Sequence, residues 1–241
     1  MTHSNTADIE TPSQYLTRAA QAAREVFARY PQHALDEQAG PAYLQGLALS
    51  RWIFWQRLTK VLRLLPPQGS RCLDFGCGFG MLLPLLQQRF DTVYGVDVMP
   101  DLAPQFLQVW DEYYHERVDR VELKADIQHH ALSDGSLDLI LALDVLEHVD
   151  ALDDLLETIA RLLKSDGVLL VTGPTENWVY QLGRRIVGFS GDYHVHSIHD
   201  IRQEMEPYFD VELVDRVFYP FTLFHVLKAT PRQPTHDGCL G

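Results

Sequence analysis

Apolar residues in the first quarter of the chain recur at the spacing of a helix face. One predicted helix runs from Pro12 to Tyr30 and is stopped by Pro31, and a second runs from about Pro41 to Leu65, before Pro66 and Pro67. The first carries the apolar positions Leu16, Ala19, Ala20, Ala23, Val26, Phe27 and Tyr30, and the second carries Phe54, Leu58, Val61, Leu62 and Leu65. Two amphipathic helices are therefore expected ahead of the rest of the fold.

From Arg71 onward, short apolar runs alternate with helical patterns. Strands are predicted at 71–75, 92–98, 121–125, 137–143 and 168–172, and helices at 81–90, 151–164 and 198–208. The sequence Ser165-Asp166-Gly167 indicates a turn between a helix and the strand that follows it. Two further strands are predicted at 209–217 and 218–229. Alternation of this kind is typical of an α/β fold with a parallel sheet.

Three glycines at alternate positions, Gly76, Gly78 and Gly80, follow the first predicted strand. Glycine permits positive φ and lets a ligand approach the backbone closely. The spacing differs from the G-x-G-x-x-G pattern of dinucleotide sites, and no Lys-Ser/Thr follows it as in a phosphate-binding P-loop. A pyrophosphate ligand is therefore disfavoured, and so is a nicotinamide-dependent oxidoreductase.

The stretch Asp74-x-Gly76-x-Gly78-x-Gly80 resembles motif I of the class I S-adenosylmethionine (SAM) dependent methyltransferases. Asp97 ends the second predicted strand, roughly twenty residues further on, where α/β nucleoside sites place a carboxylate for ribose hydroxyls. By resemblance, Asp126 and Ile127 occupy the position near the adenine amino group. The segment from Asp134 to Val149, which ends in Glu-His-Val, is similar to the fourth-strand motif of the small-molecule branch, as in ubiquinone-biosynthesis methyltransferases.

This resemblance implies a Rossmann-like, doubly wound α/β fold with a mostly parallel seven-stranded sheet and helices on both faces. The last two strands would form a hairpin with one antiparallel strand. Residues 1–66 would be a tail and an N-terminal helical lid, 67–230 the methyltransferase domain with a substrate-side insertion at about 174–199, and 231–241 a loose tail. The implied cofactor is SAM, and the expected cofactor site consists of Asp74, Gly76, Gly78, Gly80, Asp97, Val98, Asp126, Ile127 and Asp144.

Composition narrows the possible partners and the compartment. The formal net charge of -13 argues against a nucleic-acid substrate, because such binding depends on Lys and Arg near phosphates. Of the three cysteines, Cys72 and Cys77 lie on a buried strand and its turn, so a disulfide framework is not expected and a reducing cytoplasm fits. The sequence contains no run of eighteen apolar residues, so a membrane-spanning helix is not expected. A cytoplasmic protein is expected, and the sequence leaves its oligomeric state open.

Methyl transfer requires mainly that an acceptor nucleophile be held in line with the methyl group of the cofactor. For an oxygen acceptor a histidine base would help, and the candidates are His148 and His194. Alternatively, His148 caps or orients the helix after the fourth strand, and His194 is a hydrogen-bonded loop residue. His194, His196 and His199 lack companion ligands at metal-site spacing, so no metal is expected. O-methylation of a small molecule is favoured, nitrogen and carbon acceptors stay open, and a non-catalytic SAM-binding protein is the main alternative.

Two stretches combine cations with aromatic residues despite the acidic composition. Residues 51–63 carry four cations and no acid among Trp52, Phe54 and Trp55, and residues 178–189 repeat this mixture around Arg184 and Arg185. Such helices are often ordinary amphipathic surface helices. They can also contact anionic membranes or amphipathic acidic ligands. The sequence thus suggests a hydrophobic or lipid-linked acceptor and a transient membrane contact.

Overall fold

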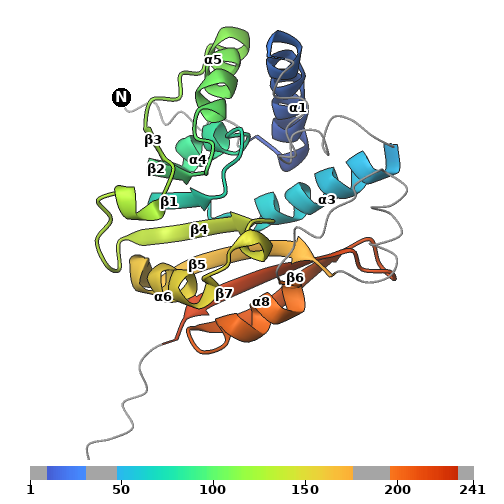
Figure 1. Ribbon diagram of the computed structural model, residues 1–241. Helices are drawn as coiled ribbons and strands as arrows, with labels where there is room; N and C mark the ends of the chain where they lie inside the picture. The colour runs from blue at the N-terminus through green and yellow to red at the C-terminus, as the bar shows by residue number, and fades with distance from the viewer. Residues whose placement is uncertain (1–9, 31–47, 176–195, 233–241) are drawn as a thin grey trace, which may run out of the picture.

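The structure, a computed structural model, describes residues 10–30, 48–175 and 196–232 (Figure 1). Its centre is a seven-stranded sheet with the strand order β3-β2-β1-β4-β5-β7-β6. The strands are β1 (Gly69–Phe75), β2 (Phe90–Val96), β3 (Val121–Lys124), β4 (Leu137–Leu143), β5 (Leu163–Pro174), β6 (Phe209–Val217) and β7 (Phe224–Pro231). β7 is antiparallel to both of its neighbours, and the other pairs are parallel. The expected mostly parallel sheet with a terminal hairpin is confirmed.

Helices cover both faces of the sheet (Figure 1). The helices α1 (Pro12–Arg29), α3 (Ala48–Leu64), α4 (Leu83–Arg89) and α5 (Leu102–Tyr114) share one hydrophobic core, and α6 (Leu152–Leu162) and α8 (Ile198–Met205) share the other. Neighbouring strand residues point to opposite faces, so Leu139 and Leu141 join the first core while Ile140 joins the second. Burial of both faces explains why the central strands are almost continuously apolar.

The predicted start of α1 at Pro12 is confirmed, and the structure adds a capping box ahead of it. Pro12 occupies the first turn, and Thr11 forms a capping box with Gln14, whose side chain accepts a hydrogen bond from the backbone N–H of Thr11 at 3.0 Å. The predicted stripe of α3 is confirmed, since Leu58, Val61 and Leu62 are all buried. The predicted start of that helix, near residue 41, falls outside the described residues.

The predicted turn at Ser165-Asp166-Gly167 is wrong. Helix α6 ends at Leu162 and β5 begins at Leu163, so the three residues belong to the strand. Leu137 pairs with Leu163, but Leu139 pairs with Val168, so β5 bulges there. The local sequence was that of a turn, but pairing with β4 on both sides of the bulge keeps the chain extended.

Several predicted boundaries also shift. Helix α4 starts at Leu83 rather than residue 81, and α8 ends at Met205 rather than residue 208. The strand predicted to start at residue 218 starts at Phe224, because residues 218–223 form the connection between β6 and β7. Apolar aromatic residues in that connection were taken for strand residues.

Helix α3 packs against the hairpin formed much later in the chain. Lys60 Nζ lies 2.7 Å from Asp215 Oδ1 of β6, and the ring of Phe54 lies 5.6 Å from that of Phe224 on β7. Among the described residues, no helix is both long enough and apolar enough to cross a bilayer.

Candidate functional site

The carboxyl ends of the parallel strands bring the predicted residues to one edge of the sheet. β1 leads into the glycine loop, β2 into Asp97, β3 into Asp126, and β4 into Asp144. The N–H groups of Gly76 and Cys77 donate to the carbonyl of Val96, at 2.8 and 3.0 Å, which ties the loop to the end of β2. In open α/β sheets, ligands bind outside this edge.

The three positions of the loop require glycine for different physical reasons. All three have positive φ, at 77°, 55° and 81° for Gly76, Gly78 and Gly80. A Cβ on Gly76 would lie 2.6 Å from Val145, and one on Gly80 would lie 2.9 Å from Ala103, so protein packing excludes a side chain at both. A Cβ on Gly78 would meet nothing within 4 Å. The backbone at Gly78 therefore faces open space that a ligand can fill.

Asp97 is held against this open part of the loop. Its Oδ2 accepts the N–H of Gly78 at 2.7 Å, and its Oδ1 accepts the N–H of Met99 at 3.0 Å. Each carboxylate oxygen keeps further acceptor capacity, so the group can also accept hydroxyl hydrogens. Next to it, Val98 is 84% exposed and Met99 is partly exposed. A bidentate acceptor beside accessible apolar surface suits a nucleoside.

Asp126 and Ile127, which follow β3 at the carboxyl edge of the sheet, differ in exposure. Asp126 is exposed, and its Oδ1 accepts the N–H of Gln128 at 2.8 Å, which caps the short 3-10 helix η2 (Ile127–His129). The side chain of Ile127 is buried in the core that contains Tyr94. Of this predicted pair, Asp126 therefore offers the polar group.

Asp144 belongs to a buried ionic cluster at the end of β4. It adopts positive φ, at 53°, and accepts the hydroxyl of Thr172 at 2.9 Å. Its Oδ2 forms an ion pair with Arg57 of α3, a residue that is only 1% exposed. That guanidinium lies 5.0 Å from the ring of Phe54 and 4.9 Å from that of Phe224. Helix α3 is thus anchored to the candidate site.

Sequence reasoning placed Arg57 among the cations of the stretch 51–63 and missed this role. A signal was present, because Arg57 lies three residues after Phe54 and four before Val61, on the apolar stripe of α3. A charged residue on a buried stripe requires an ionic partner.

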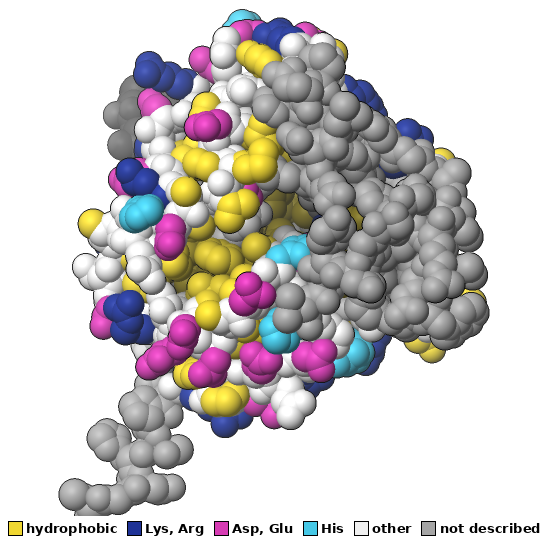
Figure 2. Space-filling model, in the orientation of Figure 1, with side chains coloured by type: hydrophobic (Ala, Val, Ile, Leu, Met, Phe, Trp, Pro, Cys, Tyr) yellow, Lys and Arg dark blue, Asp and Glu magenta, His cyan; other side chains and the backbone are white. Residues whose placement is uncertain are grey.

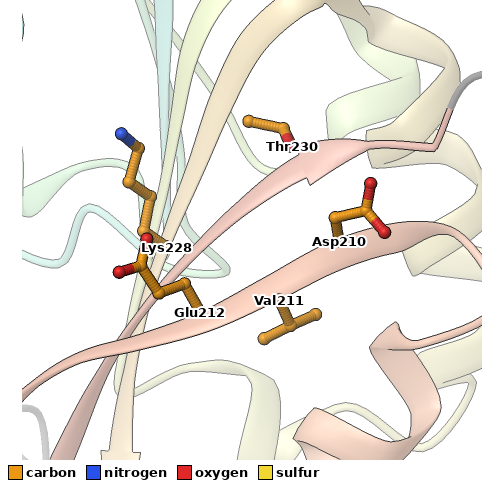
Figure 3. Close-up of a pocket in the computed structure, with 5 residues that line it drawn as sticks. All are labelled: Asp210, Val211, Glu212, Lys228 and Thr230. Carbon is orange, nitrogen blue, oxygen red and sulfur yellow. The ribbon is translucent and has the colours of Figure 1, made fainter.

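Figure 2 shows a hollow near the centre of one face of the molecule, lined by hydrophobic side chains, in the region of the middle strands in Figure 1. A separate groove crosses the outer strands of the sheet and is lined by Asp210, Val211, Glu212, Lys228 and Thr230 (Figure 3). It lies where β6 begins and β7 ends, so it is remote from the carboxyl edge.

Comparison with known proteins identifies the family of the chain. A family model described as a methyltransferase domain matches residues 50–216. The chain belongs to this family.

Curated relatives of the chain include two O-methyltransferases. The ubiquinone biosynthesis O-methyltransferase of Xanthomonas axonopodis pv. citri is 32% identical over 117 residues, covering 48% of each chain. The malonyl-[acyl-carrier protein] O-methyltransferase of Laribacter hongkongensis is 25% identical over 173 residues, covering 68% of this chain and 57% of the relative. The matched part spans about half the length of these curated relatives.

A solved structure shows the same fold. The magnesium protoporphyrin IX methyltransferase from Synechocystis PCC 6803, with bound SAH, aligns over 90% of this chain and 99% of its own with a TM-score of 0.59 and 21% identity. This likeness shows the fold of a methyltransferase domain, in agreement with the family model and with the glycine motif.

The histidines of the methyltransferase are spread over several elements. His148 is exposed in the short 3-10 helix η3 (Leu146–His148), just beyond β4, and His194 lies outside the described residues. His196 Nδ1 lies 3.5 Å from Glu204 Oε1, and the ring of His199 lies 5.1 Å from that of His225. Within the described ranges, these and the other potential ligands form no group arranged to hold a metal.

Asp74, the acid of the glycine motif, is a buried residue near the end of β1. Burial, and secondarily the negative charge of Asp97, raise the pKa of Asp74 to about 7. The ionised carboxylate is therefore costly in the protein without a cofactor. A cationic ligand nearby would favour ionisation, and the sulfonium and ammonium groups of SAM have the required charge.

This shift predicts how stability depends on pH. The pKa of Asp74 is higher in the folded than in the unfolded chain. Its neutral form therefore adds to the free energy of unfolding; this stabilisation is complete below about pH 4 and is lost as the pH rises through about 7. Between about pH 5 and pH 8 the wild-type protein without cofactor should lose roughly 2.5 kcal/mol of unfolding free energy relative to Asp74→Asn. Urea unfolding of both proteins at the two pH values measures this, and parallel pH profiles would contradict it.

Proposed function

We propose that the chain binds SAM at the carboxyl edge of the sheet and transfers its methyl group to an oxygen of a small-molecule acceptor. The proposed cofactor residues are Asp74, Gly76, Gly78, Gly80, Asp97, Val98, Asp126, Ile127 and Asp144. The observation that carries the proposal is the open space at Gly78, whose N–H is shared with the carboxylate of Asp97. A cofactor can there contact backbone and carboxylate together.

Each part of this edge has a proposed task. Asp97 accepts the ribose hydroxyls, and Asp126 lies near the adenine. Asp74 faces the positively charged amino-acid end, where the pKa of its carboxyl group falls when the ligand binds. SAM supplies an activated methyl group, and the chain contributes orientation and exclusion of water.

We propose that helices α1 and α3 form the lid over this site. Tyr15 of α1 donates from its hydroxyl to the carbonyl of Met81, just after the glycine loop, at 2.5 Å. The ring of Phe27 lies 5.7 Å from that of Phe79 within the loop. On the acceptor side, α3 contacts the end of β4 through Arg57. The predicted substrate-side insertion lies largely outside the described residues.

Oxygen is the proposed acceptor atom because the two curated relatives above are O-methyltransferases. His148 is the proposed general base, on the basis of its place just beyond β4. His194, the second candidate, falls in the undescribed segment. The proposed acceptor is hydrophobic or lipid-linked. Cys72 and Cys77 are free thiols, which supports the cytoplasm as the compartment.

Two measurements test this function. In a thermal-shift assay SAM should raise the melting temperature and NAD should not, because only a ligand of the folded state stabilises it. Formation of S-adenosylhomocysteine is then followed on a panel of phenols, carboxylic acids and amines. Turnover on amines alone would contradict the oxygen acceptor, and SAM binding without turnover on any acceptor would favour a non-catalytic SAM-binding protein.

Replacing Asp97 by Ala is expected to weaken SAM binding by at least tenfold. The carboxylate would accept hydrogen bonds from the ribose, and a hydrogen bond to a charged group is worth about 1.5 to 3 kcal/mol. It also fixes the N–H of Gly78. Isothermal titration calorimetry measures the affinity. Asp101→Ala, in the same connection and without a capping hydrogen bond to α5, is the matched control. Equal affinities for the two variants would assign the ribose to another carboxylate.

A further inference from the structure

Basic side chains gather where α8 lies beside the final hairpin of β6 and β7 (Figure 1). The ring of His199 on α8 lies 5.1 Å from that of His225 on β7. Arg216 of β6 pairs directly with His225, so the Cβ atoms of these two residues lie about 5 Å apart on the same face of the sheet. Arg202 follows His199 by three residues, on the same side of α8. We call these four residues the basic cluster.

The arginines of the basic cluster have no counter-ion in the part of the chain that the structure describes. Neither Arg202 nor Arg216 forms an ion pair there. Among the neighbouring acids, Asp200 accepts the N–H and the hydroxyl of the N-cap residue of α8 at 2.9 and 2.7 Å. Asp215 pairs with α3 on the opposite face of the sheet, and Glu206 is exposed beyond the last turn of α8. The cluster is therefore cationic in a protein whose formal net charge is -13.

His225 adds a buried polar ring to these cations. The residue is only 8% exposed, and its ring nitrogens make no hydrogen bond within the described ranges. Burial, and then the positive charges of His199, Arg216 and Arg202, lower the pKa of His225 to about 4. A buried polar group costs free energy unless it is hydrogen-bonded, and a nearby anion favours the protonated imidazole. An anion here would thus satisfy the ring and the arginines together.

The basic cluster lies on the acceptor side of the candidate site. His225 pairs with Gly173, the last residue but one of β5, so it is close to the carboxyl edge of the sheet. The strand order β4-β5-β7 places β7 two strand spacings, about 10 Å, from β4. The short helix η3, which carries His148 just beyond β4, packs against α8 in the core that contains Leu146 and Ile198. An acceptor that reacts beyond β4 can therefore reach the cluster with a group about 10 Å away.

We propose that the basic cluster binds a phosphate group of the methyl acceptor. A guanidinium is planar and can donate two parallel hydrogen bonds to a phosphate. A phosphate monoester carries about 1.5 to 2 negative charges at pH 7, so one such group can balance both arginines. A carboxylate supplies only one charge. This inference rests on the proposed function, because it assigns the cluster to one part of the acceptor.

Calorimetric titration with tyrosol phosphate, esterified at its aliphatic hydroxyl, tests the site. This probe carries a phenol oxygen at one end and a phosphate at the other. The titration is made with S-adenosylhomocysteine present, in a buffer free of phosphate and sulfate. Arg202→Gln and Arg216→Gln should each weaken binding by at least about tenfold, because each variant loses charge-assisted hydrogen bonds to the phosphate. Both arginines are at least partly exposed, so the variants should stay folded.

Arg71→Gln is the matched control. Arg71 is an exposed arginine near the start of β1, at the opposite edge of the sheet, so its removal changes the net charge equally and should leave the affinity unchanged. Phloretic acid, with a similar ring and one carboxylate, should bind more weakly than tyrosol phosphate. No binding of tyrosol phosphate to wild type, or equal affinities of wild type and both cluster variants, would overturn the phosphate site. Tighter binding of phloretic acid would assign the cluster to a carboxylate instead.

Inorganic phosphate distinguishes a group of the acceptor from a free anion. Tyrosol phosphate should bind at least about tenfold more tightly than inorganic phosphate, because its ring adds buried apolar area. Equal affinities would assign the cluster to free phosphate and overturn its role in acceptor binding.

SAM titration of the same samples keeps the two proposals apart. A wild-type protein that binds SAM but no tyrosol phosphate refutes only the phosphate site. A protein that binds tyrosol phosphate through the cluster but no SAM refutes the proposed function and leaves the phosphate site intact.

Discussion

Replacing Gly78 by Arg is expected to abolish SAM binding while the chain stays folded. A side chain at this position meets no protein atom within 4 Å, so it projects into the space assigned to the cofactor. The cost to the fold is that of a non-glycine residue at a φ of 55°, about 1 to 2 kcal/mol. Calorimetric titration with SAM measures the binding, and circular dichroism measures the fold.

Gly135→Arg is the control for this variant. Gly135 has a φ of 59°, a Cβ there would also meet nothing within 4 Å, and it lies in the turn before β4, at the opposite edge of the sheet. The same strain is thus introduced away from the site. We expect this variant to bind SAM like wild type. Unchanged affinity in a folded Gly78→Arg protein would place the cofactor elsewhere.

Replacing Arg57 by Met is expected to destabilise the protein by about 3 to 5 kcal/mol, because it leaves the carboxylate of Asp144 in a largely buried position without its cation. The packing of the guanidinium against Phe54 and Phe224 is lost as well. Urea unfolding measures the change. Asp144→Asn keeps a residue type that tolerates positive φ, and combining it with Arg57→Met should recover part of the loss.

Lys60→Met is the matched control, since it removes a cation from the same helix. Its pair with Asp215 is partly exposed, and such pairs contribute about 0 to 1 kcal/mol. A loss of similar size in the Lys60 and Arg57 variants would show that burial of the Arg57 pair adds nothing. If the Arg57 variant is folded enough to assay, SAM affinity then reports whether the cluster also positions Asp144 for the cofactor.

The alternation of apolar runs was enough to predict the sheet and its helices, because strands covered on both faces must be apolar along their length. The glycine motif predicted the loop, because packing against Val145 and Ala103 leaves no space for side chains at Gly76 and Gly80. Local signals failed where pairing between distant segments decides the conformation. The residues 165–167 have turn chemistry but remain extended beside β4.

The candidate site was predicted unevenly for the same physical reason. Asp97 and Asp126 follow the carboxyl ends of β2 and β3, so their position follows from topology alone. Arg57 lies far from the motifs in sequence, and its ion pair with Asp144 depends on how α3 crosses the sheet. The connection at 218–223 was likewise missed, because its apolar residues gave the pattern of a strand. Contacts between segments distant in sequence carry no local signature.

The docking of α3 on β6 and β7 also sets an order for folding during synthesis. Lys60 and Asp215 are separated by 155 residues, and Trp52 and Phe54 contact Phe218 and Phe224 over similar spans. As the ribosome produces the chain from its N-terminus, α3 emerges long before these partners exist. Its apolar stripe can be fully covered only after the final hairpin has formed. Until then the growing chain carries an exposed hydrophobic helix, the kind of segment that chaperones protect.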